Sequence, residues 1–252
     1  PVLITAGPGT GKTYTLVQRT IYLIEECGVK PESIFIATFT EKAAKELITR
    51  ITNELSDRGI VAKIQELYIG TFQSLWLRVL NDQIEFTRLR RNYRLLDAFD
   101  QQYMVFQNIH RFRNIPEVEV ALPNGGAWKQ SEAICNYVNN LSEELVTPEE
   151  LMSDTDLSIA ALGRILKEYR DVLTEGNLMD FSSIQIEAYH LLQDNVEILE
   201  ELRSKVTHIM VDEYQDTNFI QEQLVFLLAR DHKNICVVGD DDQGLYRFRG
   251  AT

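Results

Sequence analysis

Apolar residues gather in five short runs along the chain, each bounded by turn residues or by the start of a helical pattern. The runs are VLIT (2–5), IFIATF (34–39), LYIGTF (67–72), THIMVDE (207–213) and NICVVGD (234–240). A strand with one face in water would alternate apolar and polar residues, whereas these runs are apolar at most positions. They therefore predict buried strands of a parallel sheet.

Helical patterns separate these runs. Residues 12–27 follow a glycine-rich turn, residues 41–55 carry apolar side chains at helical spacing, and residues 221–229 lead into the last run. Strands that alternate with helices form right-handed layered structures. The pattern predicts an α/β fold, with helices flanking a parallel sheet.

The alternation stops in the middle of the chain. Residues 81–177 contain no strong strand pattern, but they include helical segments such as 132–145 and 161–173. An inserted, mostly helical domain is the economical explanation. We therefore expect a sheet domain made of residues 1–80 and 178–252, interrupted by a helical insertion at 81–177.

Charge alters this picture little. The 252 residues carry a net charge of −13, which by itself argues against a nucleic-acid-binding protein. The acidic excess lies in residues 81–252, while residues 1–80 hold nine Lys and Arg against eight Asp and Glu. Since an electropositive track can exist on an acidic protein, charge gives DNA binding no support without excluding it.

Composition also bounds the compartment. No apolar run approaches the roughly 18–20 residues of a membrane span, and the first residues, PVLITAG, lack the features of a signal peptide. The three cysteines show no C-x-x-C spacing, so zinc and disulfide scaffolds are unexpected. We expect a cytoplasmic protein and, because Pro1 stands in place of Met, a processed chain or a fragment.

A glycine-rich turn between the first strand and the first helix is the sharpest chemical signal. It reads AGPGTGKT and comprises Ala6, Gly7, Pro8, Gly9, Thr10, Gly11, Lys12 and Thr13. Its glycines let backbone N–H groups turn inward around an anion, the lysine can reach β- and γ-phosphates, and the threonine hydroxyl can bind Mg²⁺. The alternative is a glycine-rich turn without a ligand, which the strand, the helix and the Lys-Thr pair together disfavour.

A second signal lies at the end of the fourth apolar run, in THIMVDEYQDTN. Asp212 and Glu213 follow a predicted buried strand, at the end where α/β sheets bind their ligands. Alone, this is as well explained by a solvated acid pair. In one sheet with the phosphate loop, Asp212 is suited to hold Mg²⁺ and Glu213 to deprotonate water, which predicts ATP hydrolysis.

Six segments follow one another in a known order. AGPGTGKT, TFTEKAAKEL (38–47), GTFQSL (70–75), LMDFSSI (178–184), VDEYQDTN (211–218) and VVGDDDQGLYRFRGA (237–251) resemble the UvrD/Rep-like superfamily 1 DNA helicases. The resemblance covers both ends of the chain and is weaker across the helical middle. It implies a RecA-like P-loop NTPase fold with ATP and Mg²⁺ as cofactors.

The resemblance also implies roles for individual residues around the nucleotide. Lys12 and Thr13 would bind phosphates and Mg²⁺, Asp212 would support the metal, and Glu213 would be the base. Gln243 would sense the γ-phosphate or the attacking water. Gln215 and Asp216 would help to couple this site to the rest of the motor.

A second group of residues resembles the family's contacts to single-stranded DNA. It comprises Phe39, Thr40, Lys42, Thr71 and Gln73, with Tyr246, Phe248 and Arg249 as the wall of a pocket for bases. Because Phe248 lies five residues after Gln243, nucleotide and base would meet in one segment. Gln73 stands where the family usually has histidine. Structural readings compete: Thr40 is also a typical helix N-cap, and RFRG alone is an ordinary solvated turn.

By resemblance, the protein is an ATP-driven translocase and helicase on single-stranded DNA and duplex junctions, with 3′-to-5′ direction implied by the family alone. Two alternatives stay open: the motor part of a helicase–nuclease, and a nucleotide-controlled DNA-binding protein that does not unwind. The family's second motor domain supplies arginines to the nucleotide site. We expect this chain to be the first motor domain with its insertion, and to hydrolyse ATP very slowly alone.

Overall fold

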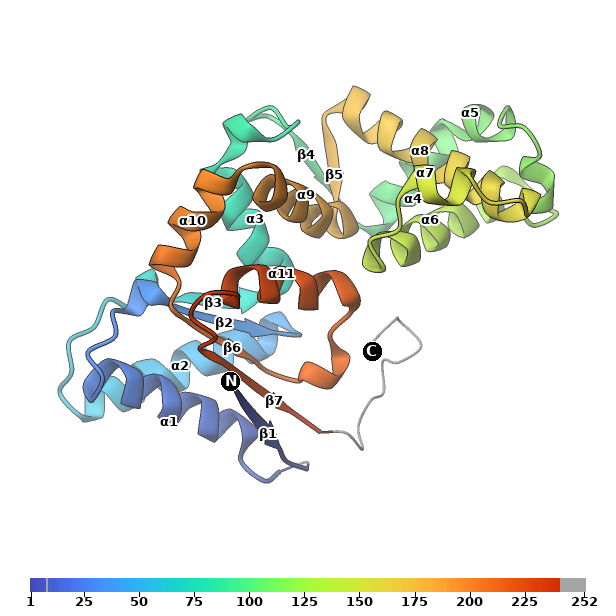
Figure 1. Cartoon of the computed structure of the whole chain (residues 1–252). Coiled ribbons are helices and arrows are strands. Elements are labelled where there is room, and N and C mark those ends of the chain that lie inside the picture. The colour runs from blue at the N-terminus through green and yellow to red at the C-terminus, as the bar shows by residue number, and fades with distance from the viewer. Residues whose placement is uncertain (8, 241–252) are drawn as a thin grey trace. The chain divides into compact units, whose positions relative to one another are not determined.

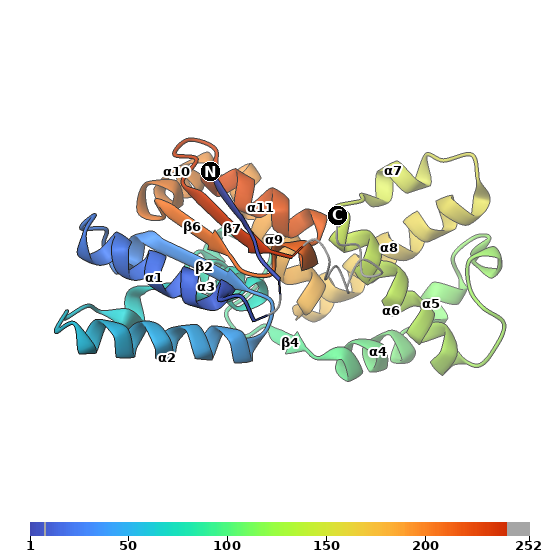
Figure 2. The ribbon, with the colours of Figure 1, turned by 90° about the horizontal axis from the view of Figure 1, so that it is seen from below.

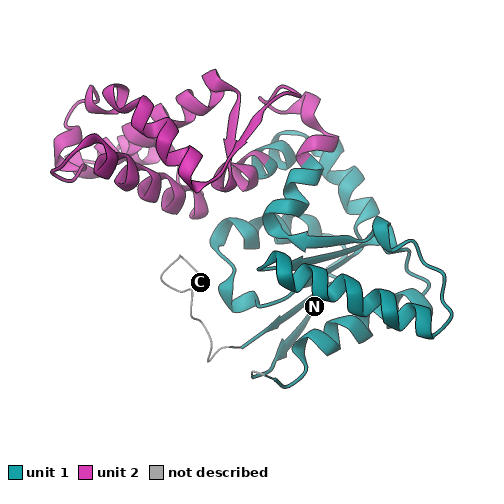
Figure 3. Cartoon of the chain, turned by 180° about the vertical axis from the view of Figure 1, so that it is seen from behind, with its two compact units in different colours: residues 1–79, 188–252 teal, residues 80–187 magenta. Residues whose placement is uncertain are grey.

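The computed structural model describes residues 1–7 and 9–240. The chain forms two compact units (Figure 3): a sheet unit of residues 1–79 and 188–252, and a helical unit of residues 80–187. The chain passes from one unit to the other within α3 (Phe72–Asp82) and returns within α9 (Phe181–Asp194).

In the part of the chain that the structure describes, the sheet unit is built on five parallel strands in the order β1-β7-β6-β2-β3. Their bounds are β1 (Val2–Thr5), β2 (Ile34–Thr38), β3 (Tyr68–Thr71), β6 (His208–Val211) and β7 (Ile235–Gly239). The five runs predicted as strands are thus confirmed, as is the α/β fold class. Because all pairings are parallel, the carboxyl ends of the five strands lie along one edge of the sheet.

Helices cover both faces of this sheet (Figures 1 and 2). On one face, α1 (Lys12–Glu25) and α2 (Glu41–Asp57) pack on alternate strand residues such as Ile36 and Met210. On the other face lie α3 and α11 (Phe219–Ala229), and the Trp76 ring of α3 is 5.7 Å from the ring of Phe35. A parallel sheet covered on both faces explains why its central strands are apolar at successive positions.

Strand β1 differs from the prediction of a buried strand. Val2 is 40% exposed and Leu3 is 70% exposed. The reason is its place in the sheet, since β1 pairs with β7 alone and forms an edge of the described strands. An apolar run does not reveal whether a strand is central or at an edge.

The helical unit packs its helices around a separate apolar core, to which Val105, Phe112, Ile134, Ile165 and Leu166 contribute. Its helices are α4 (Ala98–Gln107), α5 (Ile109–Arg113), α6 (Ala127–Glu143), α7 (Pro148–Met152) and α8 (Leu157–Gly176). The predicted helical character of this stretch is confirmed. The sequence pattern missed one feature, a two-stranded parallel sheet of β4 (Arg94–Leu96) and β5 (Leu178–Asp180).

A buried polar network ties β5 to the helices of this unit. The Asp180 carboxylate accepts hydrogen bonds from the Tyr169 hydroxyl, from Gln101 Nε2 at 3.0 Å and from the Ser183 backbone N–H at 2.7 Å. Burial and the adjacent carboxylate raise the pKa of Tyr169 well above its ordinary value. The hydroxyl therefore stays protonated and remains a donor to Asp180.

The described residues also form the helix α10 (Val196–Lys205) and five short 3₁₀ turns. The turns are Pro31–Ser33, Ile64–Glu66, Ile84–Phe86, Val118–Val120 and Tyr214–Asp216. Among the described residues, no helix combines the length and apolar character that a membrane crossing requires.

Candidate phosphate site and acidic strand ends

The glycine-rich loop follows the edge strand β1 and is bonded to the neighbouring strand β7. After β1 ends, the Ala6 N–H donates to the carbonyl of Gly239 at 3.0 Å, which links the loop to the end of β7. Gly9 and Gly11 adopt left-handed backbone angles, with φ of 71° and 98°. Only glycine takes such angles without strain, so these two positions require the residue that they have. Pro8 lies outside the described residues.

The loop feeds directly into α1, which begins at Lys12. Its N-cap, Gly11, provides no side-chain hydrogen bond, and the first turn contains no acidic residue. The first backbone N–H groups of a helix have no partner within the helix and carry partial positive charge. An uncapped start next to a left-handed glycine is therefore suited to a bound anion. Thr13 occupies the same first turn.

The acidic pair, Asp212 and Glu213, follows the end of β6, which pairs with β7 in the sheet. The Asp212 N–H donates to the carbonyl of Ala37 at 2.9 Å, so the residue continues the pairing of β6 with β2. Asp212 is 6% exposed. Glu213 has a left-handed backbone with φ of 49°. A residue other than glycine adopts this conformation at a cost, and such residues concentrate at functional sites.

Lys12 and Glu213 meet across this edge. Lys12 Nζ lies 2.9 Å from Glu213 Oε2, and the lysine side chain is 9% exposed. The same carboxylate oxygen accepts a hydrogen bond from Gln215 Nε2 at 2.9 Å. The structure thus brings the phosphate loop and the acidic strand end together, as the sequence-based site requires.

The charge state of Asp212 reflects its surroundings. Burial, followed by the Glu213 carboxylate, raises its pKa from 3.8 to about 6, against smaller opposing effects of the Glu213 backbone N–H and Lys12. A nearby divalent cation stabilises the ionised form of such a buried carboxylate. Among the described residues, no cluster of three or more His, Cys, Asp or Glu side chains could hold a metal ion. The oxygen donors Asp212 and Thr13 fit Mg²⁺, which binds few protein carboxylates and takes its other ligands from phosphates and water.

The residues predicted to contact DNA gather at the ends of β2 and β3. Thr38 pairs with Thr71 in the sheet register, and the Thr71 hydroxyl donates to Glu41 Oε1 at 3.2 Å. Phe39 and Gln73 are half-buried, and Lys42 is exposed. The predicted N-cap role of Thr40 is confirmed, because its hydroxyl accepts from the Ala43 N–H at 3.1 Å. Glu41 was not singled out from the sequence, although it directly follows that cap.

Besides Pro8, four predicted residues lie outside the described residues: Gln243, Tyr246, Phe248 and Arg249. The described chain ends at Asp240, whose N–H donates to Gln215 Oε1 at 3.0 Å. Gln215 and Asp216 belong to the 3₁₀ turn after β6. The link from this turn to the end of β7 was not evident in the sequence.

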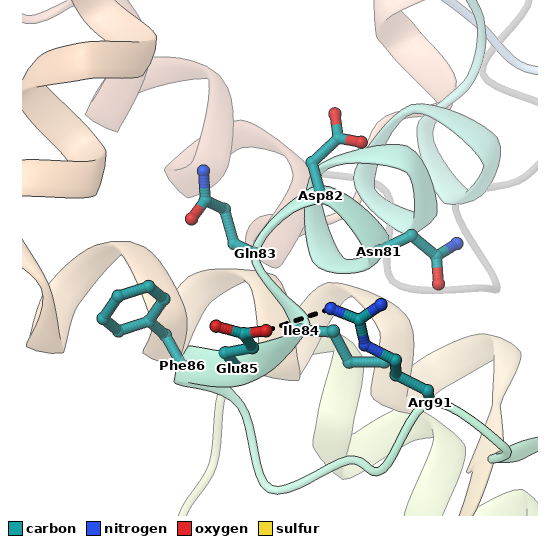
Figure 4. A pocket seen from close by; sticks show the side chains of 7 residues that line it. All are labelled: Asn81, Asp82, Gln83, Ile84, Glu85, Phe86 and Arg91. Atoms are coloured by element: carbon teal, nitrogen blue, oxygen red, sulfur yellow. Dashed lines mark hydrogen bonds and ion pairs between the residues drawn. The ribbon is translucent and has the colours of Figure 1, made fainter.

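An open pocket of about 350 Å³ lies within the helical unit. It is lined by Asn81, Asp82, Gln83, Ile84, Glu85, Phe86 and Arg91. Figure 4 shows Glu85 and Arg91 facing each other there, and their side chains form an ion pair of 3.0 Å. None of the sequence-predicted site residues lines this pocket.

Comparison with known proteins gives one consistent result. The model of the UvrD/REP helicase N-terminal domain matches residues 1–252. An ATP-dependent DNA helicase PcrA from Staphylococcus epidermidis is 34% identical over 252 residues, and one from Staphylococcus aureus is 33% identical. The matches cover 100% of this chain and 32% of each relative, so the chain spans about a third of their length. With its phosphate loop facing an acidic strand end, the chain belongs to the UvrD/REP helicase family.

Proposed function

We propose that this chain binds ATP and DNA as part of an ATP-driven translocase and helicase that acts on single-stranded DNA. The observation that carries the proposal is the contact between Lys12 and Glu213, 2.9 Å apart. It joins a phosphate-binding residue type to a water-activating one at a single site. The names of the PcrA relatives, which are ATP-dependent DNA helicases, support the same class of activity.

In this proposal the phosphate loop holds the triphosphate. The left-handed Gly9 and Gly11 and the uncapped start of α1 direct N–H groups to the phosphates. Lys12 contacts the terminal phosphates. Asp212 and Thr13 would hold Mg²⁺, which offsets phosphate charge when bound.

In this proposal Lys12 bonds first to Glu213 and then to a phosphate of the bound ATP. While Lys12 bonds to Glu213, the carboxylate oxygen is occupied by the lysine. When Lys12 turns to a phosphate, Glu213 loses this partner and becomes available to accept a proton from water. Gln215 donates to the same oxygen, and in this proposal that bond orients the carboxylate when the lysine leaves.

We place the DNA track along the ends of β2 and β3. Phe39, Thr40, Lys42, Thr71 and Gln73 gather there, on the same edge of the sheet as the phosphate loop. Adjacent strand ends offer a short route by which a change at the nucleotide reaches DNA. The 3′-to-5′ direction, the roles of Gln243, Tyr246, Phe248 and Arg249, and the need for a second motor domain belong to the proposal through the family resemblance.

The test measures ATP hydrolysis with and without single-stranded DNA, and strand separation of a tailed duplex. Both are measured in the longest polypeptide that carries this chain. Glu213→Gln should retain ATP binding and lose hydrolysis and strand separation together. Strand separation at the unaltered rate in this variant would refute the proposal, because the protein would then not be driven by hydrolysis at this site.

A further inference from the structure

Four aromatic side chains form an exposed patch on the helical unit, which we call the aromatic platform. Phe99, Tyr103 and Phe106 come from α4, and Trp128 comes from the first turn of α6. Their exposed fractions are 64%, 44%, 37% and 42%, respectively. The spacing of 99, 103 and 106 puts three rings on one face of α4, and α6 packs against α4 (Figures 1 and 2).

The four rings contact one another in a closed cycle. Phe99 and Tyr103 are nearly parallel, with centroids 6.2 Å apart and planes at 5°. Tyr103 and Phe106 lie 6.4 Å apart at 19°. Trp128 completes the cycle, 6.0 Å from Phe99 and 5.5 Å from Phe106. Such ring pairs stabilise each other, so the platform is ordered although it faces solvent.

Contacts between α4 and α6, and burial of the other face of α4, fix the position of the platform. Gln102 Nε2 donates to the carbonyl of Trp128 at 3.2 Å, which connects the two helices beside the rings. The opposite face of α4 is buried through Gln101, Met104 and Val105. An exposed apolar surface that the fold keeps in place is more typical of a binding surface than of a core.

Positive charge adjoins the rings. In the helical unit, all of which the structure describes, Lys129 and Arg113 take part in no ion pair. Lys129 reaches the carbonyl of Asn124, and Arg113 bonds to Gln130. Asp100, which directly follows Phe99 of the platform, is paired with Arg94 at 2.6 Å.

Most of the other arginines in residues 88–130 are already paired with carboxylates, namely Arg88, Arg91, Arg94 and Arg111. Lys129 lies in the first turn of α6 next to Trp128, and Arg113 bonds to Gln130 of the same turn. Two cations without a carboxylate partner beside exposed rings favour an anionic occupant.

We infer that the aromatic platform binds single-stranded DNA by stacking its bases, with Lys129 and Arg113 contacting the phosphates. Ring faces accept any base, and rings beside cations are the combination found in sequence-tolerant binding of single strands. The choice of DNA rests on the proposed function, but the site is separate from the ends of β2 and β3. The helical unit thereby provides a second grip on the strand.

The experiment measures fluorescence anisotropy of the complete 252-residue chain with an oligothymidylate of about 20 nucleotides. An abasic strand of equal length has the same phosphates and no bases to stack. The double variant Tyr103→Ala/Trp128→Ala should bind oligothymidylate at least about fivefold more weakly and bind the abasic strand as the unaltered chain does. Tyr103→Phe/Trp128→Phe keeps the rings and should retain the affinity.

Phe86→Ala is the matched control, since Phe86 is 59% exposed in the same unit and lies outside the platform. It should leave the affinity unchanged. As a readout that needs no variant, 5-iodouracil in the oligonucleotide should crosslink to Tyr103 or Trp128, mapped by mass spectrometry.

Unchanged affinity in the double variant, equal losses on both strands, or crosslinks confined to other residues would each overturn the inference. Sedimentation that shows a dimer lost in the double variant, with DNA affinity intact, would assign the platform to protein contact and also overturn it. The proposed function is judged separately by the hydrolysis test on Glu213, which involves no platform residue.

Discussion

The side chain of Gln215 joins the two acidic strand ends: its Oε1 accepts the N–H of Asp240 at 3.0 Å, while its Nε2 donates to Glu213 at 2.9 Å. The space beside it is full, because a Cβ added to Gly239 would come within 2.9 Å of Gln215 Oε1. One amide thus fixes the candidate base relative to the strand that leads into the GDDDQ segment.

Gln215→Ala should therefore impair turnover more than nucleotide binding. Groups that orient catalytic side chains typically contribute about 10–100-fold to activity, so we expect kcat for ATP to fall by that order while KM changes little. Steady-state hydrolysis by the longest polypeptide that carries this chain provides the measurement. Gln193→Ala is the control, since that amide is exposed and bonds to the Tyr189 hydroxyl. A change confined to KM would contradict the orienting role.

Lys12 and Glu213 should respond differently to removal of their charge. Lys12→Ala removes the proposed phosphate contact and leaves Glu213 without its cation, so we expect a large loss of ATP affinity. Glu213→Gln frees Lys12 and should leave ATP affinity equal or higher, while hydrolysis falls by about 10²–10⁴-fold. Binding of a fluorescent ATP analogue, followed by turnover assays, distinguishes the two. Equal losses of affinity in both variants would show that the ion pair only holds the loop together.

Asp212 should make the free chain less stable as pH rises. Its pKa in the folded chain is about 6, above the ordinary 3.8, so the folded state binds this proton more tightly than the unfolded state does. Stability is therefore highest below the unfolded pKa and declines as pH rises from about 4 to 6, by up to about 3 kcal/mol for this group. Thermal unfolding without nucleotide and with a chelator measures the change.

Asp212→Asn removes that charge and keeps an oxygen acceptor for the Glu213 N–H. The variant should melt at a higher temperature than the unaltered chain at pH 8 and at nearly the same temperature near pH 4. A lower melting temperature at pH 8 would contradict the charge argument. Greater stability with loss of activity is a common result at functional sites.

Gly163 should be required for the packing of α7 on α8. A Cβ at this position would lie 2.8 Å from the Leu151 Cβ, the Met152 nitrogen and the Pro148 oxygen. Two of these atoms are backbone and cannot yield easily, so we expect Gly163→Ala to lower the free energy of unfolding by about 1–3 kcal/mol. Chemical denaturation measures this change.

Gly126→Ala is the matched control in the same unit, because its Cβ would meet nothing within 4 Å. Gly126 is the N-cap of α6, so its replacement should cost less than about 1 kcal/mol. If the two alanine variants were equally stable, the prediction that close packing at Gly163 requires glycine would be wrong.

Local patterns in the sequence predicted most of the strands and helices, but not whether a strand lies in the centre or at an edge of the sheet. The runs that became β2, β3, β6 and β7 were recognisable because a central parallel strand is apolar on both faces. The same reasoning failed for β1, where Leu3 is 70% exposed. β4 and β5 were missed because three residues are too few to show a period.

The site was predictable in its parts. The glycines of the phosphate loop are required by backbone angles that the local chain must adopt, and an acid pair after an apolar run is visible in the sequence. The link between Gln215 and Asp240, and the contact of Glu41 with Thr71, depend on partners distant in the chain. No local pattern encodes such pairs.

The sequence by itself determined the alternation of strands and helices, the turn of the phosphate loop and the types of residue available to it, because these depend on near neighbours and on glycine's conformational freedom. Only the tertiary structure decided that Lys12 meets Glu213, 201 positions away, and that four rings from α4 and α6 gather on one surface. Those contacts follow from the order of strands in the sheet and from helix packing. Both are set by the burial of apolar side chains from segments that are distant in the sequence.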